Sequence, residues 1–133
     1  MGMKIYSGGG RQVLADVDGF TVRTDQPVED GGQGAAPEPF TLFLASIGTC
    51  AGHYVYSYCA QRRLSIDGIT LAQRVERDKR SKLIEKVILE IRVPDDFPER
   101  HRAALARAAG VCTVKKQLLP SIEFEITTRG GAA

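Results

Sequence analysis

The chain has 133 residues, which is enough for one domain with a sizeable hydrophobic core. Its 18 basic and 16 acidic residues give a net charge of +2, and no basic run is interleaved with aromatic residues, so nothing indicates a nucleic-acid or membrane partner. The three cysteines, an odd number, argue against a structural disulfide framework and favour buried or reactive thiols.

The first ten residues, MGMKIYSGGG, contain no apolar core of the kind that a signal peptide needs. Tyr6 also stands where N-myristoylation requires Ser or Thr. We therefore expect a cytoplasmic protein with a single domain over residues 1–133.

Three short strands are predicted in the N-terminal quarter of the chain. Residues 3–6 form the first, and a glycine-rich turn separates it from a second strand at Gln12–Val17. Asp18-Gly19 is a strong hairpin signal, and the alternating segment Phe20–Thr24 completes an antiparallel meander. Residues 26–37 are rich in Gly, Pro and acidic residues and are predicted to form a loop.

The segment Pro39–Gln61 is predicted to be one long helix. It contains no Asp, Glu, Lys or Arg, and polar residues interrupt its apolar ones, so burial in protein is favoured over burial in lipid. Such a helix would be roughly 35 Å long, whereas a globule of this size has a radius of gyration of only about 14 Å. We therefore expect a second subunit to help cover it.

The remainder of the chain is predicted to contain two strands, two helices and a final strand. These elements are expected at Ile69–Arg77, Leu83–Val93, about Phe97–Ala109, Cys112–Leu119 and Ile122–Ile126. A solvated turn at residues 78–81 joins the two strands, and Gly110 is expected to end the first helix. The order βββ-α-ββ-αα-β has no repeating βαβ unit and predicts an α+β fold with antiparallel sheets.

Cys50 lies in the middle of the long helix. At about 100° per residue it shares a helix face with Phe43, Ile47 and Tyr54. This face could hold a buried thiol next to an apolar substrate.

Cys59 is nine residues further along and points to the opposite side of the helix. It shares that side with Gly48 and Gly52, whose spacing would allow another helix to approach closely. Cys59 is therefore best interpreted as a packing residue.

Cys112 follows the predicted helix stop and begins a new helical turn, with Lys115 and Lys116 close behind. A helix N-terminus and nearby lysines lower a thiol pKa, which indicates a reactive cysteine. A small buried residue at a helix start is the alternative for this segment.

Four features of the chain belong together: the glycine-rich loop, the motif Pro39-x-x-Leu42-x-Leu44-Ala45-Ser46-Ile47-Gly48-Thr49-Cys50, the strand opening Asp67-Gly68, and the motif Cys112-Thr113-Val114. In these features the chain resembles the OsmC/Ohr family (osmotically inducible protein C-like, thiol-dependent hydroperoxide reductases). The resemblance covers most of the chain.

The resemblance implies a peroxidatic Cys50 that becomes a sulfenic acid and a resolving Cys112 that condenses with it to a disulfide. An external dithiol would reduce this disulfide, and neither a cofactor nor a metal is implied. Phe43, Ile47 and Tyr54 would bind an organic hydroperoxide. The implied architecture is an intertwined homodimer with antiparallel sheets packed around long central helices.

The chain departs from the family pattern near the start of the helix. Family peroxidases carry a Glu one or two places after the helix-start Pro, where this chain has Phe40 and Thr41. Glu38 is the nearest carboxylate. The activating Arg of the family comes from the N-terminal strands, where Arg11 is the first candidate and Arg23 the second.

Three alternatives accompany the peroxidase hypothesis. Without the family Glu, the protein could be a non-catalytic OsmC-fold protein that binds a small molecule. His53 could pair with Cys50 or bind a metal, although a histidine at a helix interface or pocket rim is the simpler interpretation. RNA binding of the KH type is disfavoured because the chain has no GxxG loop and no basic surface.

Overall fold

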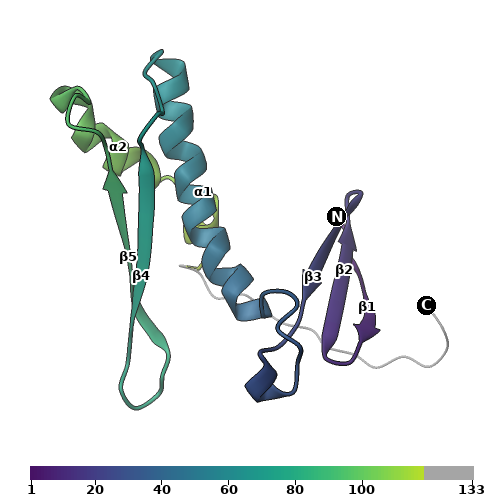
Figure 1. Cartoon of the computed structure of the whole chain (residues 1–133). Helices are drawn as coiled ribbons and strands as arrows, with labels where there is room; N and C mark the ends of the chain where they lie inside the picture. The colour runs from purple at the N-terminus through teal and green to yellow at the C-terminus, as the bar shows by residue number, and fades with distance from the viewer. Residues whose placement is uncertain (119–133) are drawn as a thin grey trace. The chain divides into compact units, whose positions relative to one another are not determined.

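The computed structural model describes residues 1–118 and shows a long helix, two antiparallel sheets and a short helical region after them (Figure 1). The elements are β1 (Lys4–Gly9), β2 (Gln12–Val17), β3 (Phe20–Thr24), η1 (Val28–Asp30), α1 (Pro39–Gln61), β4 (Thr70–Arg77), β5 (Ile84–Arg92), η2 (Glu99–His101), α2 (Arg102–Ala109) and α3 (Thr113–Leu118). The predicted α+β class with antiparallel sheets is confirmed. The predicted final strand at Ile122–Ile126 lies outside the described residues.

The chain divides into two compact units. The first comprises Met1–Thr49 and Ala72–Leu89, and the second comprises Cys50–Leu71 and the chain from Glu90 onward. The elements α1, β4 and β5 each contribute residues to both units. The expectation of a single domain stays a prediction.

The strands β1, β2 and β3 form an antiparallel meander in the first unit. Asp18 and Gly19 connect β2 to β3 with φ values of 49° and 82°. Positive φ at both central residues is the requirement of a type I′ hairpin turn, and Val17 pairs with Phe20 across it. The predicted hairpin is confirmed.

One face of this meander is apolar and exposed. Ile5, Ala15 and Val22 pair in one row across the three strands, and Val17 and Phe20 pair in a neighbouring row on the same face. Phe20 is 73% exposed and Ile5 is 60% exposed. We call these five residues the open sheet face.

Asp25 organises the loop that leads from β3 to α1. Its side chain is buried, and its carboxylate accepts the backbone N–H groups of Gln26 at 2.8 Å, Ala35 at 3.1 Å and Gln33 at 3.2 Å. These bonds, above all the one from Ala35, hold the pKa of Asp25 below its usual value. A Cβ atom on Gly32 would collide with the carbonyl oxygen of Gln26, so the closed loop requires glycine there.

The helix α1 covers Pro39–Gln61, as predicted. It ends where Arg63 adopts a left-handed φ of 54°. Arg62 lies over the ring of Tyr58, 3.6 Å from its centroid, and donates to the Tyr58 carbonyl oxygen at 3.2 Å. A cation therefore lies at the negative end of the helix dipole. Within residues 1–118, no helix is long and apolar enough to cross a membrane.

The small-residue side of α1 faces the strand β4, which runs alongside the helix (Figure 1). A Cβ atom on Gly48 would lie 2.5 Å from Oε1 of Gln73, whose Nε2 donates to the Leu44 carbonyl oxygen at 2.9 Å. A Cβ atom on Gly52 would lie 3.8 Å from Cδ1 of Leu71. The prediction that another helix approaches these two glycines is therefore wrong, because side chains of a strand fill the space.

The predicted helix at 97–109 begins as an α-helix later than expected. Pro98 is followed by the 3₁₀ turn η2, and the α-helical segment α2 starts only at Arg102. Gly110 caps α2 with a φ of −71°, so this glycine ends the helix without adopting the left-handed conformation. The second unit buries an apolar core against α2, formed by Ala51, Val55, Cys59, Ile69, Phe97, Leu105, Ala109 and Cys112.

Candidate functional site

Cys50 is positioned by the long helix. It is partly exposed, whereas Cys59, on the same helix, is completely buried. Burial raises the pKa of the Cys59 thiol, which suits a packing role and not a reactive one.

Cys112 is positioned by the junction between α2 and α3. Its side chain is 2% exposed, and its sulfur accepts the backbone N–H of Lys115 at 3.4 Å. Its carbonyl oxygen accepts the N–H of Lys116 at 3.2 Å. Cys112 therefore caps the N-terminus of α3 with its sulfur, in the manner of a Ser or Thr cap.

The two cysteines meet in the second unit, where the side chain of Cys112 hydrogen bonds with the Cys50 sulfur. Both are reduced thiols in this structure. The backbone N–H groups of Val114 and Thr113, at the start of α3, also lower the pKa of the Cys50 thiol. Three groups from one short segment therefore favour the charged form of Cys50.

These contacts make the pair electrostatically unequal. The N–H of Val114 lowers the pKa of Cys50 most, followed by the Cys112 thiol, and the N–H of Thr113 adds to them. Burial raises the pKa of Cys112, and so does its interaction with Cys50. These opposite shifts favour the thiolate form at Cys50 and the protonated form at Cys112.

This polarity corrects the sequence-based interpretation of Cys112. The start of α3 and its lysines were expected to lower the pKa of Cys112, but burial outweighs them and raises it. The first amides of α3 instead lower the pKa of Cys50, which lies in a segment far away in the sequence. Periodicity and local spacing contain no signal for that contact.

Tyr54 lies one helical turn after Cys50, and its hydroxyl forms a 3.0 Å hydrogen bond with the Thr113 hydroxyl. Its ring also lies edge-on to His53, with 5.2 Å between centroids. His53 is exposed, and no cluster of His, Cys, Asp and Glu among residues 1–118 could hold a metal ion. The bond from Tyr54 to Thr113 was not foreseen, although a Thr at a predicted helix start next to a cysteine is a signal for a polar contact.

The other predicted site residues belong to the first unit. Arg11 is exposed, and its Nε lies 3.3 Å from the point where a Cβ of Gly31 would be. Arg23 is exposed on β3, and the Glu38 carbonyl oxygen accepts the Leu42 N–H at the start of α1. Roles for Arg11, Arg23 and Glu38 at the Cys50 sulfur stay predictions.

The predicted substrate-binding residues Phe43 and Ile47 also lie in the first unit, on α1. Phe43 is 39% exposed and stacks on Phe40, with 5.6 Å between the ring centroids, whereas Ile47 is buried. The guanidinium of Arg77 lies 5.2 Å from the centroid of the Phe40 ring. Phe40, one of the two positions at which the sequence resemblance expects a Glu, thus forms an aromatic and a cationic contact.

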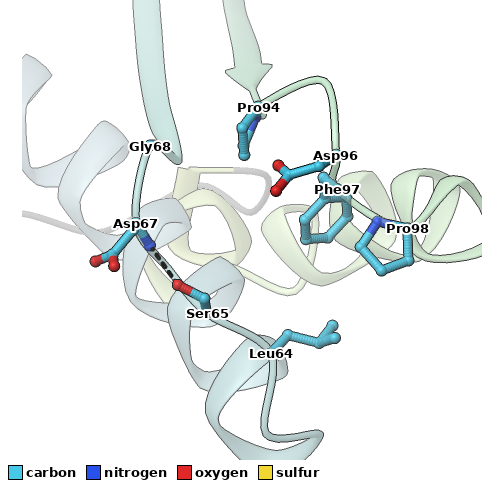
Figure 2. A pocket seen from close by; sticks show the side chains of 8 residues that line it. All are labelled: Leu64, Ser65, Asp67, Gly68, Pro94, Asp96, Phe97 and Pro98. Atoms are coloured by element: carbon cyan, nitrogen blue, oxygen red, sulfur yellow. Dashed lines mark hydrogen bonds between the residues drawn. The ribbon is translucent and has the colours of Figure 1, made fainter.

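A hollow of about 540 Å³ lies beside the turn that follows α1 (Figure 2). It is lined by Leu64, Ser65, Asp67, Gly68, Pro94, Asp96, Phe97 and Pro98. Its volume is in the range of small-ligand pockets. No cysteine is among the lining residues, so this hollow is distinct from the thiol pair.

The sequence comparisons decide the family. The family model described as OsmC-like protein matches residues 31–127, which include both Cys50 and Cys112. The chain belongs to the OsmC-like protein family. No curated protein sequence matches this OsmC-like chain.

Solved structures share the OsmC-like fold. An osmotic-stress-induced and detoxification-response protein from Psychrobacter arcticus is 20% identical with a TM-score of 0.73, covering 90% of this chain and 89% of its own. An organic hydroperoxide resistance protein OsmC from Legionella pneumophila is 19% identical with a TM-score of 0.56, covering 90% of each chain. The organic hydroperoxide resistance protein OhrB of Bacillus subtilis is 19% identical with a TM-score of 0.54, covering 90% and 91%. At these identities the similarity establishes the fold alone.

Proposed function

We propose that this OsmC-like protein reduces organic hydroperoxides in oxidative stress defence, with Cys50 as the peroxidatic and Cys112 as the resolving thiol. The observation that carries the proposal is the direct contact of two reduced cysteines with opposite pKa shifts. A peroxidatic cysteine must be a thiolate to attack, and a resolving cysteine must lie within bonding reach of it.

The proposed cycle has three balanced steps. The Cys50 thiolate attacks the O–O bond of ROOH, and with one proton the products are a Cys50 sulfenic acid and ROH. The Cys112 sulfur then displaces hydroxide from the sulfenic acid, and with the Cys112 proton this leaves a Cys50–Cys112 disulfide and water. An external dithiol reduces the disulfide and is itself oxidised, which restores both thiols.

Family membership and fold support a redox role. The chain belongs to the OsmC-like family, and two proteins that share its fold are named for organic hydroperoxide resistance. Phe43 and Ile47, on the helix that carries Cys50, favour an organic hydroperoxide over hydrogen peroxide as the substrate. In this proposal the protein is a homodimer and is located in the cytoplasm.

A steady-state assay with cumene hydroperoxide and dithiothreitol tests the proposal. We expect the wild-type protein to consume hydroperoxide and Cys50→Ser to abolish consumption. Without dithiothreitol, Cys112→Ser is expected to react once and then accumulate a Cys50 sulfenic acid, which dimedone would trap. Cys59→Ala is the matched control and should keep wild-type activity. Equal consumption by wild type and Cys50→Ser would refute the proposal.

A non-catalytic protein that binds small molecules is the second candidate. Phe40 and Thr41, at the positions where family peroxidases carry a Glu, favour it, as does the hollow beside Asp67 and Asp96. The pKa of Cys50 discriminates between the two, because an unactivated thiol titrates at about 8.5 or above. The lowered pKa of Cys50 favours the peroxidase.

A further inference from the structure

The contact between α1 and α3 contains a pair of hydroxyl groups on residues that lie close in sequence to the two cysteines. Tyr54 follows Cys50 by four residues, so the two side chains leave α1 on the same face, one turn apart. The Tyr54 hydroxyl forms its 3.0 Å bond with the hydroxyl of Thr113, the first residue of α3. The two helices are therefore tied together one turn away from the Cys50 sulfur.

Thr113 is linked to the sulfur through its own backbone. Its N–H and the N–H of Val114 both favour the charged form of Cys50. A Thr side chain is stiff about χ1 because it is branched at Cβ. A bond that fixes the Thr113 hydroxyl therefore also restrains the direction of the Thr113 N–H.

We propose that Tyr54 and Thr113 are positioning residues for the reaction of Cys50, and that their hydroxyl–hydroxyl bond keeps the first amides of α3 directed at the Cys50 sulfur. The inference rests on the proposed function, because the sulfur that is positioned is the one that attacks the hydroperoxide. Neither hydroxyl needs to touch the substrate. Tyr54 thus has a role in the site that differs from the substrate contact expected from the sequence.

The same bond also concerns the second step of the proposed cycle. Cys112 precedes Thr113 directly, and its sulfur is held by the Lys115 N–H of the same turn. A first turn of α3 that is fixed on α1 therefore keeps the Cys112 sulfur beside Cys50. Loss of the bond should weaken thiolate formation and slow the closure of the disulfide.

The test compares variants that each remove one hydroxyl. Tyr54→Phe keeps the ring, and Thr113→Val keeps the branched shape and the backbone N–H. We expect each to raise the pKa of Cys50 by about half a unit and to lower its alkylation rate at pH 6 by roughly threefold. The double variant should resemble either single variant because both remove the same bond. Thr113→Ser, which keeps the hydroxyl, should restore the wild-type pKa.

Tyr56→Phe is the matched control. Tyr56 lies on the same helix, and its hydroxyl donates to the Ile69 carbonyl oxygen at 3.0 Å, away from α3. This variant should keep the wild-type pKa of Cys50. Thr113→Pro removes both the hydroxyl and the N–H and should raise that pKa more than Thr113→Val does.

The pKa is measured from the pH dependence of iodoacetamide alkylation, read at the Cys50 peptide by mass spectrometry without any peroxide. The inference is overturned if Tyr54→Phe and folded Thr113→Val both titrate like the wild type, or if their effects add in the double variant. If Thr113→Val does not fold, Tyr54→Phe alone decides. Failure of the proposed function would be seen separately, as a wild-type protein that consumes no hydroperoxide although its Cys50 pKa responds to these variants.

Discussion

At the scale of single residues, the site depends on one sulfur atom that receives several hydrogen bonds. Hydrogen bonds to a charged group contribute about 1.5–3 kcal/mol each, and here they come from Val114, Cys112 and Thr113. They favour the charged form of Cys50 against the cost of its burial. A lower pKa makes more of Cys50 a thiolate at neutral pH, and this is the form that attacks peroxides.

The donor role of Cys112 can be tested by removing its thiol. We expect Cys112→Ala to raise the pKa of Cys50 by about one to two units, because one hydrogen bond to the thiolate is lost. Cys112→Ser keeps a donor and should cause a smaller rise, and Cys59→Ala should cause none. The pH dependence of Cys50 alkylation measures all three, and an unchanged Cys50 pKa in Cys112→Ala would contradict the assigned polarity.

The lowered pKa of Asp25 predicts that the folded protein loses stability at acidic pH. Its pKa is lowered in the folded protein, so its stabilising effect is complete above the ordinary carboxyl pKa of about 3.9 and is lost as the pH falls through the folded value. We expect Asp25→Asn to lower the midpoint of thermal unfolding at pH 7 by several degrees and to lose less stability than the wild type between pH 5 and pH 2. If the unfolding midpoints of the wild type and Asp25→Asn fell equally between pH 5 and pH 2, this role of Asp25 would be contradicted.

At the scale of elements, α1 places two glycines, Gly48 and Gly52, against side chains of β4, and the space around the two differs. Gly52→Ala should stabilise the protein by about 0.5–1 kcal/mol, because alanine favours a helix and its methyl group would meet Leu71 at an ordinary contact distance. Gly48→Ala gains the same helix propensity but displaces Gln73 and breaks its bond to Leu44, a loss of about 1 kcal/mol.

The two glycine variants are compared by urea denaturation. Gly52→Ala should unfold at a higher midpoint than the wild type, and Gly48→Ala at an equal or lower one. A higher midpoint for Gly48→Ala than for Gly52→Ala would show that β4 does not restrict the helix at Gly48.

Elements with a strong local signal were predictable from the sequence. The absence of charge over Pro39–Gln61 fixed both ends of α1, and Asp18-Gly19 fixed the hairpin, because both signals concern neighbouring residues. The partner of Gly48 was not predictable, since a small residue permits the approach of a strand as well as a helix. The direction of the first α3 amides toward Cys50 likewise depends on how two distant segments pack.

At the scale of the whole molecule, the open sheet face supports the proposed homodimer. Phe20, Ile5 and Val22 are 73%, 60% and 38% exposed on one side of the meander. Contiguous exposed apolar patches commonly mark interaction surfaces. The long helix α1 contains no charged residue, and this independently favours its burial by a second chain.

Light scattering coupled to size-exclusion chromatography tests the dimer. We expect a mass of twice the 14.5 kDa chain. The double variant Phe20→Lys/Val22→Lys should shift the protein toward the monomer, because it adds charge to the open sheet face. Thr21→Lys adds one positive charge on the other face of β3 and should leave the mass unchanged. A monomeric wild type would rule out the dimer.

The central claim, that Cys50 and Cys112 form a redox pair, is tested most directly by thiol counting. The reduced protein is treated with one equivalent of cumene hydroperoxide, its remaining thiols are counted, and its unreduced peptides are identified by mass spectrometry. We predict that two of the three thiols disappear, with a Cys50–Cys112 disulfide and an intact Cys59. Persistence of the Cys50 and Cys112 thiols under excess hydroperoxide would contradict the account.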